Sequence, residues 1–417
     1  MNYLALHSPL DLHCDIAQLK AQVSLRITKE IQIHALWVRS EPDNEEVLYP
    51  MHLTHKDAHW HYWQGEFKLN EAEVLSLYCF KYLAGETKQQ YWLSSAGISS
   101  YFPDRHKHFV VNPHFKAPSW LYEQVFYQIF PERFCDGNPD NNVKAGEYLY
   151  VDKPVVAKAW HELPDRTQGQ REFFGGDLEG ILQKLDYLQD LGVTALYLTP
   201  IFSSPSSHKY DTTDYYQIDP HFGGEGAFLS LREGLRARAM RLILDIAVNH
   251  TSERHPWFDR YGEHQNLGAY RGHGSPTRDY YSFHNDDPES YHGWLGFVKT
   301  LPVLNYGSEG VRKVMYQSDE AILRYWLRKP YEIDGWRLDV IHMLGEGTGA
   351  KDNHHYVREF RRVVKAENPE AYLLGEHTFE ASTWLKGDEE DAAMNYFGFM
   401  HPMWSLFCWG RSSLASP

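Results

Sequence analysis

Three short apolar segments of the chain end in charged or polar residues. The first runs through Asp245 to His250, the second contains Arg337 and Asp339, and the third ends in Glu376. A charge within an apolar strand is costly unless it is paired or solvated. Because three segments carry this cost at the same end, the pattern indicates a functional site.

The spacing of these residues predicts two different roles for two carboxylates. Arg337 and Asp339 are two residues apart, so they lie on the same side of a strand, where the guanidinium would keep the carboxylate ionised and oriented as a nucleophile. Glu376 follows an apolar strand, where desolvation and a nearby anion would raise its pKa and keep the proton of a general acid. Taken singly, Asp245 and Arg337 could instead form a buried ion pair that only holds strands together.

The elements that must position these residues have the pattern of a parallel sheet. From Val125 onward, short and nearly continuous apolar runs alternate with helix-length stretches, which predicts strands covered on both faces. In parallel barrels, chemistry collects at the carboxyl ends of the strands. The predicted strands are residues 125–130, 195–199, 242–247, 335–340, 371–375 and 392–396, with helices at 178–191, 227–239 and 318–327 and an insertion at about 250–306.

The first part of the chain has a different pattern. Residues 1 to about 115 alternate apolar and polar positions, for example over 22–28, 31–38 and 75–82, which predicts strands with one buried face. Two prolines, Pro113 and Pro118, then mark a linker. We therefore predict a β-sandwich domain over 1–115 and a barrel domain over 116–417.

Composition narrows the class of partner. Lys and Arg number 41 against 56 Asp and Glu, a formal charge of −15, which disfavours nucleic acids and anionic membranes. We see no apolar window of about 18 residues and no secretion signal. The aromatic content of 15% suits sugar rings, although aromatic residues also fill cores. Four widely spaced cysteines without a C-x-x-C motif predict neither zinc nor disulfides, so we expect a cytoplasmic protein.

Five segments in order resemble the α-amylase superfamily, glycoside hydrolase family 13. Residues 245–250 match its D-x-x-x-N-H block, 335–339 its G-x-R-x-D block, and 375–376 its catalytic glutamate block, while 301–305 and 208–215 are similar to two connecting segments. The resemblance spans about 120–404 and implies a (β/α)8-type TIM barrel with about six strands present. The amino-terminal part resembles the starch-binding-like domain of the cyclomaltodextrinase and neopullulanase branch, and residues 208–210, 337–346, 375–377 and 390–396 look most like the maltodextrin glucosidases of that branch.

The resemblance implies a retaining hydrolysis of α-glucosidic bonds in maltodextrins, with no cofactor required for the chemistry. Asp339 would form the covalent glycosyl-enzyme, Arg337 would orient it, and Glu376 would protonate the leaving oxygen and then activate water. Such a double displacement needs the two carboxyls about 5 to 5.5 Å apart. A neopullulanase or cyclomaltodextrinase activity is an alternative.

Four further residues are implied to bind the substrate. Tyr210 resembles the family's stacking tyrosine under the reacting sugar, Asp245 and His250 resemble residues that shape the same subsite, and His377 is a candidate for the acceptor side. Considered alone, Tyr210 would be read as a core or rim residue and His250 as a satisfied histidine.

A structural calcium ion is also implied. An asparagine-rich turn and a second loop resemble the calcium loop of the same branch, and hard oxygen ligands suit this ion. The alternative is an ordinary turn. The candidate ligands are Asp136, Asn138, Asn141, Asn142, Gly175 and Asp177.

One family block is missing from the sequence. The family carries a third acid in an S/N-H-D type block, and no such block follows Tyr396. We therefore expect a carboxyl-terminally truncated chain with very little hydrolase activity as given, or an inactive remnant that acts at most as an α-glucan-binding module. The branch also implies a homodimer through the amino-terminal domain.

Overall fold

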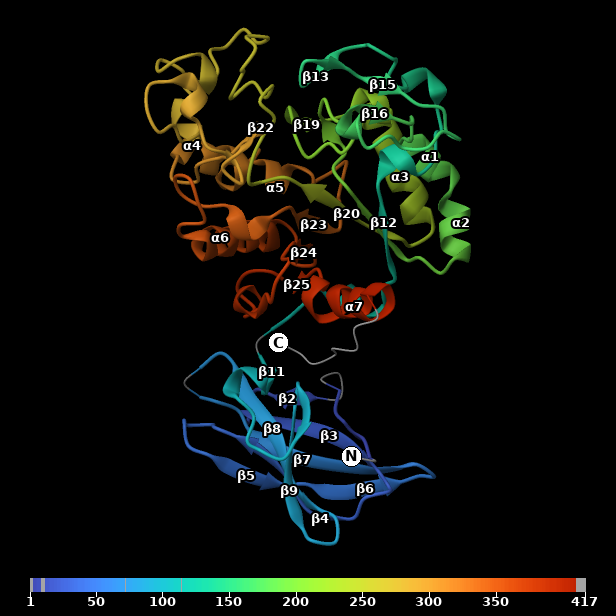
Figure 1. Ribbon diagram of the computed structural model, residues 1–417, viewed down its shortest axis with the longest axis vertical. Helices are drawn as coiled ribbons and strands as arrows, with labels where there is room; N and C mark the ends of the chain where they lie inside the picture. Colours follow the sequence, from blue (N-terminus) through green and yellow to red (C-terminus); the bar gives the residue numbers. More distant parts are fainter. Residues whose placement is uncertain (1–2, 9–11, 72, 114, 410–417) are drawn as a thin grey trace. The chain divides into compact units, whose positions relative to one another are not determined.

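The computed structural model describes residues 3–8, 12–71, 73–113 and 115–409, which form two compact units (Figure 1). Unit 1 comprises residues 1–115 and 398–417, and unit 2 comprises residues 116–397.

Unit 1 contains two antiparallel sheets that share one apolar core. Alternate residues of the long strands, such as Val23, Leu25 and Val38, are buried in that core, which also contains Phe80. The antiparallel β-rich domain predicted from the period-two pattern is thereby confirmed. One sheet contains β1 (Ala5–Leu6), β2 (His13–Asp15), β3 (Lys20–Thr28), β6 (His52–Lys56) and β7 (Trp60–Lys68), and the other β4 (Ile33–Ser40), β5 (Val47–Pro50), β8 (Ser76–Ala84), β9 (Gln89–Ser94), β10 (Gly97–Ser99) and β11 (Phe109–Val111).

Unit 2 is built on a curled parallel sheet of six strands in chain order (Figure 1). This confirms the predicted TIM-barrel-type fold. The last strand is shorter than predicted, because a wide helical turn begins at Tyr396. The strands are β12 (Phe126–Ile129), β17 (Ala195–Leu198), β20 (Arg241–Ile246), β23 (Gly335–Leu338), β24 (Tyr372–Gly375) and β25 (Ala392–Ala393).

The predicted helices are present but shorter or shifted. Lys184 departs from helical geometry and divides the first helix in two, and extended backbone at Ala321 delays the start of the third to Ile322. The second begins early, directly after the left-handed residue Gly223. The helices are α1 (Leu178–Gln183), α2 (Leu185–Asp190), α3 (Gly224–Ala237), α4 (Glu309–Arg312), α5 (Ile322–Tyr325), α6 (Asn353–Glu367) and α7 (His401–Trp409). No helix in the described part of the chain is long and apolar enough to cross a membrane.

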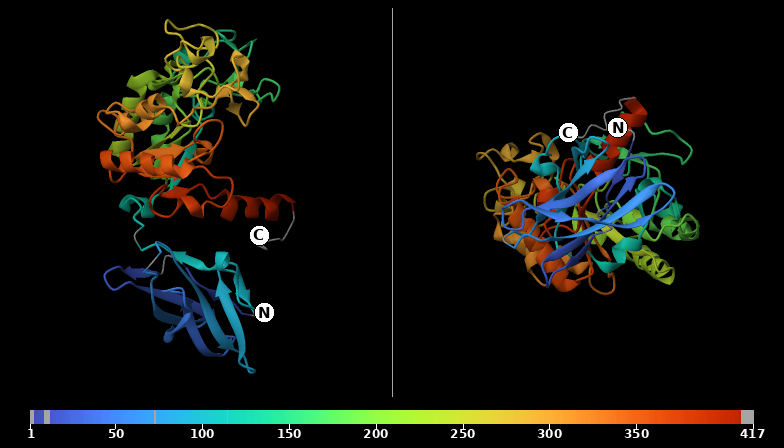
Figure 2. Two further views of the ribbon diagram at one scale, coloured as in Figure 1. Left: turned by 90° about the vertical axis from the view of Figure 1, so that its left-hand side faces the viewer. Right: turned by 90° about the horizontal axis from the view of Figure 1, so that it is seen from below.

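The predicted insertion consists of short turns and one hairpin around buried aromatic residues. Phe258, Tyr281 and Tyr291 belong to the main core of unit 2. The segment lies at the end of this unit that carries β13 and β19, and it stays there in the view turned by 90° (Figures 1 and 2). The hairpin is β21 (Gly293–Trp294) with β22 (Val298–Pro302), and the other short strands are β13 (Leu149–Tyr150), β14 (Lys153–Pro154), β15 (Val156–Ala157), β16 (Glu172–Phe173), β18 (Phe202–Ser203) and β19 (Asp214–Ile218).

A buried carboxyl fixes the loop between β16 and α1. Glu132, which follows β12, accepts hydrogen bonds from the backbone N–H groups of Phe174 and Gly175, the latter at 2.8 Å. Burial raises the pKa of Glu132 from its ordinary value of 4.5 to about 7. The native state therefore binds this proton more tightly than the unfolded chain does.

We predict that Glu132 makes stability depend on pH between about 4.5 and 7. Because its folded pKa is the higher one, its unfavourable contribution grows as pH rises through this window, by up to about 3 kcal/mol. Glu132→Gln keeps the acceptor oxygen and should flatten this part of the profile. Urea unfolding at several pH values measures it, with the exposed Glu233→Gln as the control; equal slopes in all three proteins would contradict the prediction.

Candidate active site

One guanidinium connects three carboxyl groups at the ends of adjacent strands. Arg337 Nη1 lies 2.7 Å from Asp339 Oδ1 and 2.9 Å from Asp245 Oδ1, and Arg337 Nη2 lies 2.7 Å from Glu376 Oε1. Arg337 and Asp339 are 3% and 7% exposed, and Asp245 is fully buried. The structure thus brings the predicted nucleophile, acid and arginine together with Asp245.

The parallel register of the sheet explains this meeting. β20 and β23 place Asp245 beside Arg337, and β23 and β24 place Leu338 beside Gly375. Asp339 and Glu376 follow these strands directly, so both carboxyls emerge at the same edge. The sequence pattern of polar residues at strand ends predicted this arrangement because the register of a parallel sheet aligns those ends.

The backbone after the nucleophile is strained and is held by the candidate acid. Val340 has a φ of +37°, which is rare for a β-branched residue, and its N–H donates to Glu376 Oε2 at 3.0 Å. Asp339 N–H in turn donates to Ile246 O at 3.0 Å. The turn that aims Asp339 therefore depends on contacts with both neighbouring strands.

This cluster contains more acidic groups than basic ones: three carboxyls and one guanidinium. Burial raises the pKa of Asp245 and of Asp339, while the Arg337 guanidinium opposes both shifts. Burial also opposes the charge of Arg337, but Asp245 and Asp339 outweigh it and raise the arginine pKa. One cation cannot neutralise three carboxylates, so mutual repulsion favours protons shared within the cluster. Proton transfer is the chemistry that such a cluster supports.

The environment of Glu376 differs from the expected one. The sequence suggested an apolar strand end beside an anion, but the carboxyl pairs with Arg337 and with the Val340 N–H. The reason is that the two ends of one guanidinium reach both flanking strands.

Two tyrosines complete the polar contacts of Asp245. Tyr210 donates to Asp245 Oδ2 at 2.9 Å and Tyr197 donates to the same oxygen at 2.5 Å. The Tyr210 ring lies 5.9 Å from the guanidinium carbon of Arg337. Tyr197 was missed in the sequence, where its only signal was a polar-tipped ring within the apolar run of β17.

His250 is buried beside this group and remains neutral. Burial lowers its pKa to about 3, and the backbone of Tyr210 partly opposes the shift. Its Nε2 atom is buried and has no hydrogen-bond partner among the described residues, so its hydrogen-bonding capacity is unused. The Trp294 ring, on the hairpin of the insertion, lies 6.0 Å from the His250 ring. Sequence analysis missed Trp294, because nothing local marks its contact with His250.

His377 is buried and forms a hydrogen bond with Glu390. Its Nε2 atom lies 2.9 and 3.0 Å from the two carboxyl oxygens of Glu390, and both side chains are fully buried. Burial lowers the pKa of His377 to about 4. Gly375, which precedes the acid, packs against the same carboxyl: a Cβ there would collide with Glu390. Glu390 therefore contacts the residues on both sides of Glu376.

The six candidate calcium ligands divide into two groups. The carboxyl of Asp177 accepts backbone N–H groups from Gly137 at 3.1 Å, Asn138 at 2.9 Å and Gly180 at 2.6 Å, so it stabilises the loop and caps α1. Asn138 uses its side-chain oxygen to accept the N–H of Asp140. These two side chains are engaged with the protein itself.

The other side chains leave oxygens unsatisfied. Asp136 Oδ1, Asn141 Oδ1 and Asn142 Oδ1 are buried without a hydrogen-bond partner among the described residues. Asn142 Nδ2 donates to Asp136 Oδ2 at 2.9 Å, which orients both groups. Gly175 allows this approach, because a Cβ there would collide with Asn142. Three orphaned hard oxygens in one loop fit a calcium ion.

A curled parallel sheet that presents an aspartate and a glutamate on one arginine at its carboxyl ends is typical of glycoside hydrolase barrels. The family model of the alpha amylase catalytic domain matches residues 128–410, so the chain belongs to the α-amylase family. The family expected from the sequence motifs is confirmed.

Relatives with this domain include the intracellular maltogenic amylase of Bacillus subtilis, 41% identical over 70% of this chain and 44% of its own length. A cyclomaltodextrinase of Geobacillus thermopakistaniensis is 36% identical over 83% of this chain and 54% of its own length. The structure of the type III pullulan hydrolase of Thermococcus kodakarensis matches with a TM-score of 0.63 at 27% identity, covering 94% of this chain and 64% of that one. The chain spans about half the length of the curated relatives it matches.

We predict that Arg337→Met lowers the free energy of unfolding by roughly 3–5 kcal/mol at pH 8, because it leaves buried carboxyls without their cation. The loss should be smaller at pH 5, since the carboxyls can then bind protons. Denaturant titration at both pH values measures this.

The matched control for Arg337→Met is Arg362→Met. Arg362 makes only an exposed pair with Glu359 on α6, at 2.8 Å, and surface pairs contribute at most about 1 kcal/mol. A loss for Arg337→Met that is as small as the control's, or that is the same at both pH values, would contradict the charge balance described above.

Proposed function

We propose that this chain carries the catalytic machinery for retaining hydrolysis of α-glucosidic bonds in maltodextrins. The observation that supports it is that the Arg337 guanidinium contacts both carboxyls. Its Nη1 atom lies 2.7 Å from Asp339 and its Nη2 atom lies 2.7 Å from Glu376. Two carboxyls that share one guanidinium in this way are compatible with the separation of about 5 to 5.5 Å that a double displacement needs.

In the proposed reaction, Asp339 attacks the anomeric carbon, while Arg337 orients its carboxylate and opposes the rise in pKa that burial causes. Glu376 gives its proton to the leaving oxygen and later takes a proton from the attacking water. Substrate entry would have to separate Glu376 from Arg337 before the first step. The contacts of Val340 with Glu376 would keep the acid near the nucleophile during this change.

The sugar in the reacting subsite would contact Tyr210, Asp245 and His250. The Tyr210 ring is fixed by its bond to Asp245, so it offers a preorganised face to a sugar ring. The unpartnered Nε2 atom of His250 supplies a hydrogen-bonding group for a hydroxyl. His377 would act through its bond to Glu390, behind the acid, and not by direct contact with the acceptor.

The choice of maltodextrins rests on the relatives and on one local motif. The relatives are named as a maltogenic amylase, a cyclomaltodextrinase and a type III pullulan hydrolase. The Gly375-Glu376-His377 motif favours the maltodextrin glucosidase type within this group.

We propose a cytoplasmic location, as the name of the intracellular relative suggests, and dimerisation through unit 1 stays a prediction. Two alternatives are a neopullulanase activity and glucan binding without turnover.

Covalent trapping tests the nucleophile directly. 5-Fluoro-α-maltosyl fluoride has a leaving group that needs no protonation, so it should glycosylate Asp339 even when acid catalysis is weak. Peptide mass spectrometry should find the sugar on the peptide that contains Asp339. Asp339→Asn should abolish the labelling, whereas Glu376→Gln should still be labelled but should cleave maltotriose about 10²- to 10⁴-fold more slowly.

The exposed Glu380→Gln, on the loop after β24, is the control and should match the parent chain in both assays. NMR of the first product formed should show the α-anomer, as retention requires. Binding of maltotriose without any labelling of Asp339 would overturn the proposed hydrolysis and favour the glucan-binding alternative.

We also propose that the loop of Asp136, Asn141 and Asn142 binds a structural calcium ion. The support is the three buried oxygens that lack partners, together with the charge that Asp136 adds. The ion would satisfy these oxygens and fix the loop, and it would take no part in the reaction.

The calcium prediction concerns stability. Calcium at 100 times its Kd should raise the free energy of unfolding by about 2.7 kcal/mol over the value in EGTA, and thermal unfolding measures the difference. Asp136→Asn should weaken the effect because it removes the ligand charge. Asp140→Asn, an exposed residue of the same turn, should leave it unchanged. Equal melting with calcium and with EGTA would contradict the proposal.

A further inference from the structure

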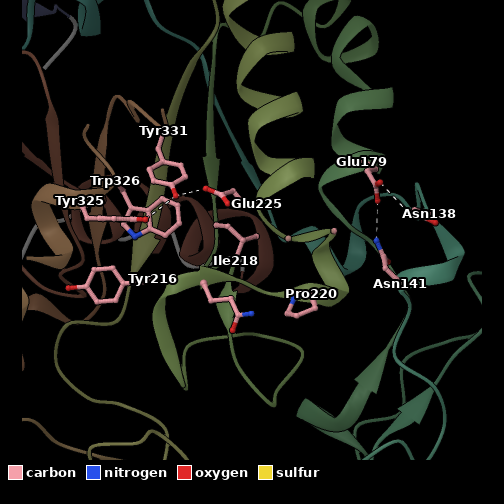
Figure 3. A pocket seen from close by; sticks show the side chains of 13 residues that line it. Asn138, Asn141, Glu179, Tyr216, Ile218, Pro220, Glu225, Tyr325, Trp326 and Tyr331 are labelled. Carbon is pink, nitrogen blue, oxygen red and sulfur yellow. Dashed lines mark hydrogen bonds between the residues drawn. The ribbon is translucent and has the colours of Figure 1, made fainter. Parts of the chain in front are cut away.

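A second pocket lies apart from the carboxyl cluster, and Figure 3 shows its lining. Its volume is about 590 Å³, within the range of roughly 300–1,000 Å³ that is usual for small-molecule sites. It is bordered by the Asn138–Asn141 turn, by β19 and the start of α3, and by the segment that follows α5. None of Arg337, Asp339 and Glu376 lines it.

One end of the pocket is an aromatic surface whose hydroxyls are all engaged. Tyr216 is 40% exposed, donates to Glu320 O at 2.7 Å, and packs edge-on against Tyr325 at 5.1 Å between ring centroids. The Tyr325 and Tyr331 hydroxyls are 3.0 Å apart, and Tyr331 donates to Glu225 at 2.5 Å. These bonds hold the rings rigidly, so a ligand would meet a preformed surface.

The other end of the pocket is polar. Glu179 accepts hydrogen bonds from the side-chain amides of Asn138 at 3.3 Å and Asn141 at 3.0 Å, so this end consists of a carboxylate held by two amides (Figure 3). Between the two ends, Gly223 and Gly224 have φ values of +89° and +64°. A Cβ on Gly224 would meet nothing within 4 Å, so the floor of the pocket is bare backbone.

The lining determines the class of ligand. Glu179 and Glu225 are carboxylates, and no lysine, arginine or histidine is among the described residues of the lining, so anions such as phosphorylated compounds are disfavoured. Carboxylate and amide groups suit vicinal hydroxyls, and the partly exposed Tyr216 ring suits the C–H face of a sugar. These features together favour a neutral, polyhydroxylated ligand.

We propose that this pocket is a second, non-catalytic binding site for an α-glucan, with room for one or two sugar rings. One ring would pack on Tyr216, and the hydroxyls of the ligand would bond to Glu179. The identity of the sugar rests on the proposed function, whereas the site itself rests on the pocket. Held by a second site, a long glucan would rebind at a raised effective concentration.

Hydroxyl-radical footprinting of the full chain tests this proposal residue by residue. The protein carries Asp339→Asn to prevent turnover, and maltotriose is the probe. Oxidation of Tyr216 and Tyr325 should fall by about half when maltotriose equals its Kd for this pocket, because half of the pockets are then occupied. Protection of Tyr210 and Trp294 reports separately on the catalytic site.

Variants of Tyr216 link the protection to the pocket. Tyr216→Ala should abolish protection of Tyr325, whereas Tyr216→Phe should keep it, because the ring remains. Tyr187→Ala is the matched control, since Tyr187 is 56% exposed on α2, outside the pocket. Unchanged circular dichroism establishes that each variant is folded.

Each outcome decides between the two sites. Protection of Tyr325 without protection of Tyr210 would support the second site and overturn glucan binding at the catalytic one. Protection of Tyr210 alone, at every soluble concentration of maltotriose, would overturn the second site. Protection that survives in Tyr216→Ala, or that tetramethylammonium produces and maltotriose does not, would also overturn it, the latter in favour of a cation site.

Discussion

The Arg337 guanidinium is the contact on which the rest of the catalytic unit depends. It lies within 2.9 Å of oxygens on Asp245, Asp339 and Glu376, so it joins β20, its own strand β23 and β24 at one edge. A buried cation of this kind is tolerable only with carboxylates around it, and the carboxylates only with the cation. The strained turn at Val340 and the register of the strands both serve this one charge arrangement.

The sequence carried enough information to find this cluster but not its surroundings. Apolar runs that end in Asp245, Asp339 and Glu376 indicate adjacent parallel strands, and the register of such a sheet brings their ends together. Tyr197 contacts Asp245 and Trp294 contacts His250 across the fold, and no local pattern marks either residue. The pairing of Glu376 with Arg337 was missed for a similar reason, because an extended guanidinium reaches a strand that sequence spacing does not specify. Helix ends depended on single residues such as Lys184 and Ala321, whose backbone geometry the sequence pattern does not specify.

The polar loops of unit 2 show how similar side chains take different roles. The carboxyl of Asp177 is used by backbone N–H groups, whereas Asp136 and two neighbouring asparagines keep oxygens without partners. Residue type alone suggested one ligand set of six. The hydrogen bonds of each side chain separate the groups that hold the loop from the groups that could bind an ion. Among the described residues, His250 Nε2 likewise has no hydrogen-bond partner.

The contact between Gly375 and Glu390 links two positions that are far apart in the sequence. The carboxyl of Glu390 fills the volume that any side chain at position 375 would need, and it also satisfies His377. A larger residue at 375 requires a smaller one at 390, and that replacement leaves a buried imidazole without its partner. The three positions can therefore change only as a set, and in related chains we expect their residue types to vary together, independently of Glu376, which they surround.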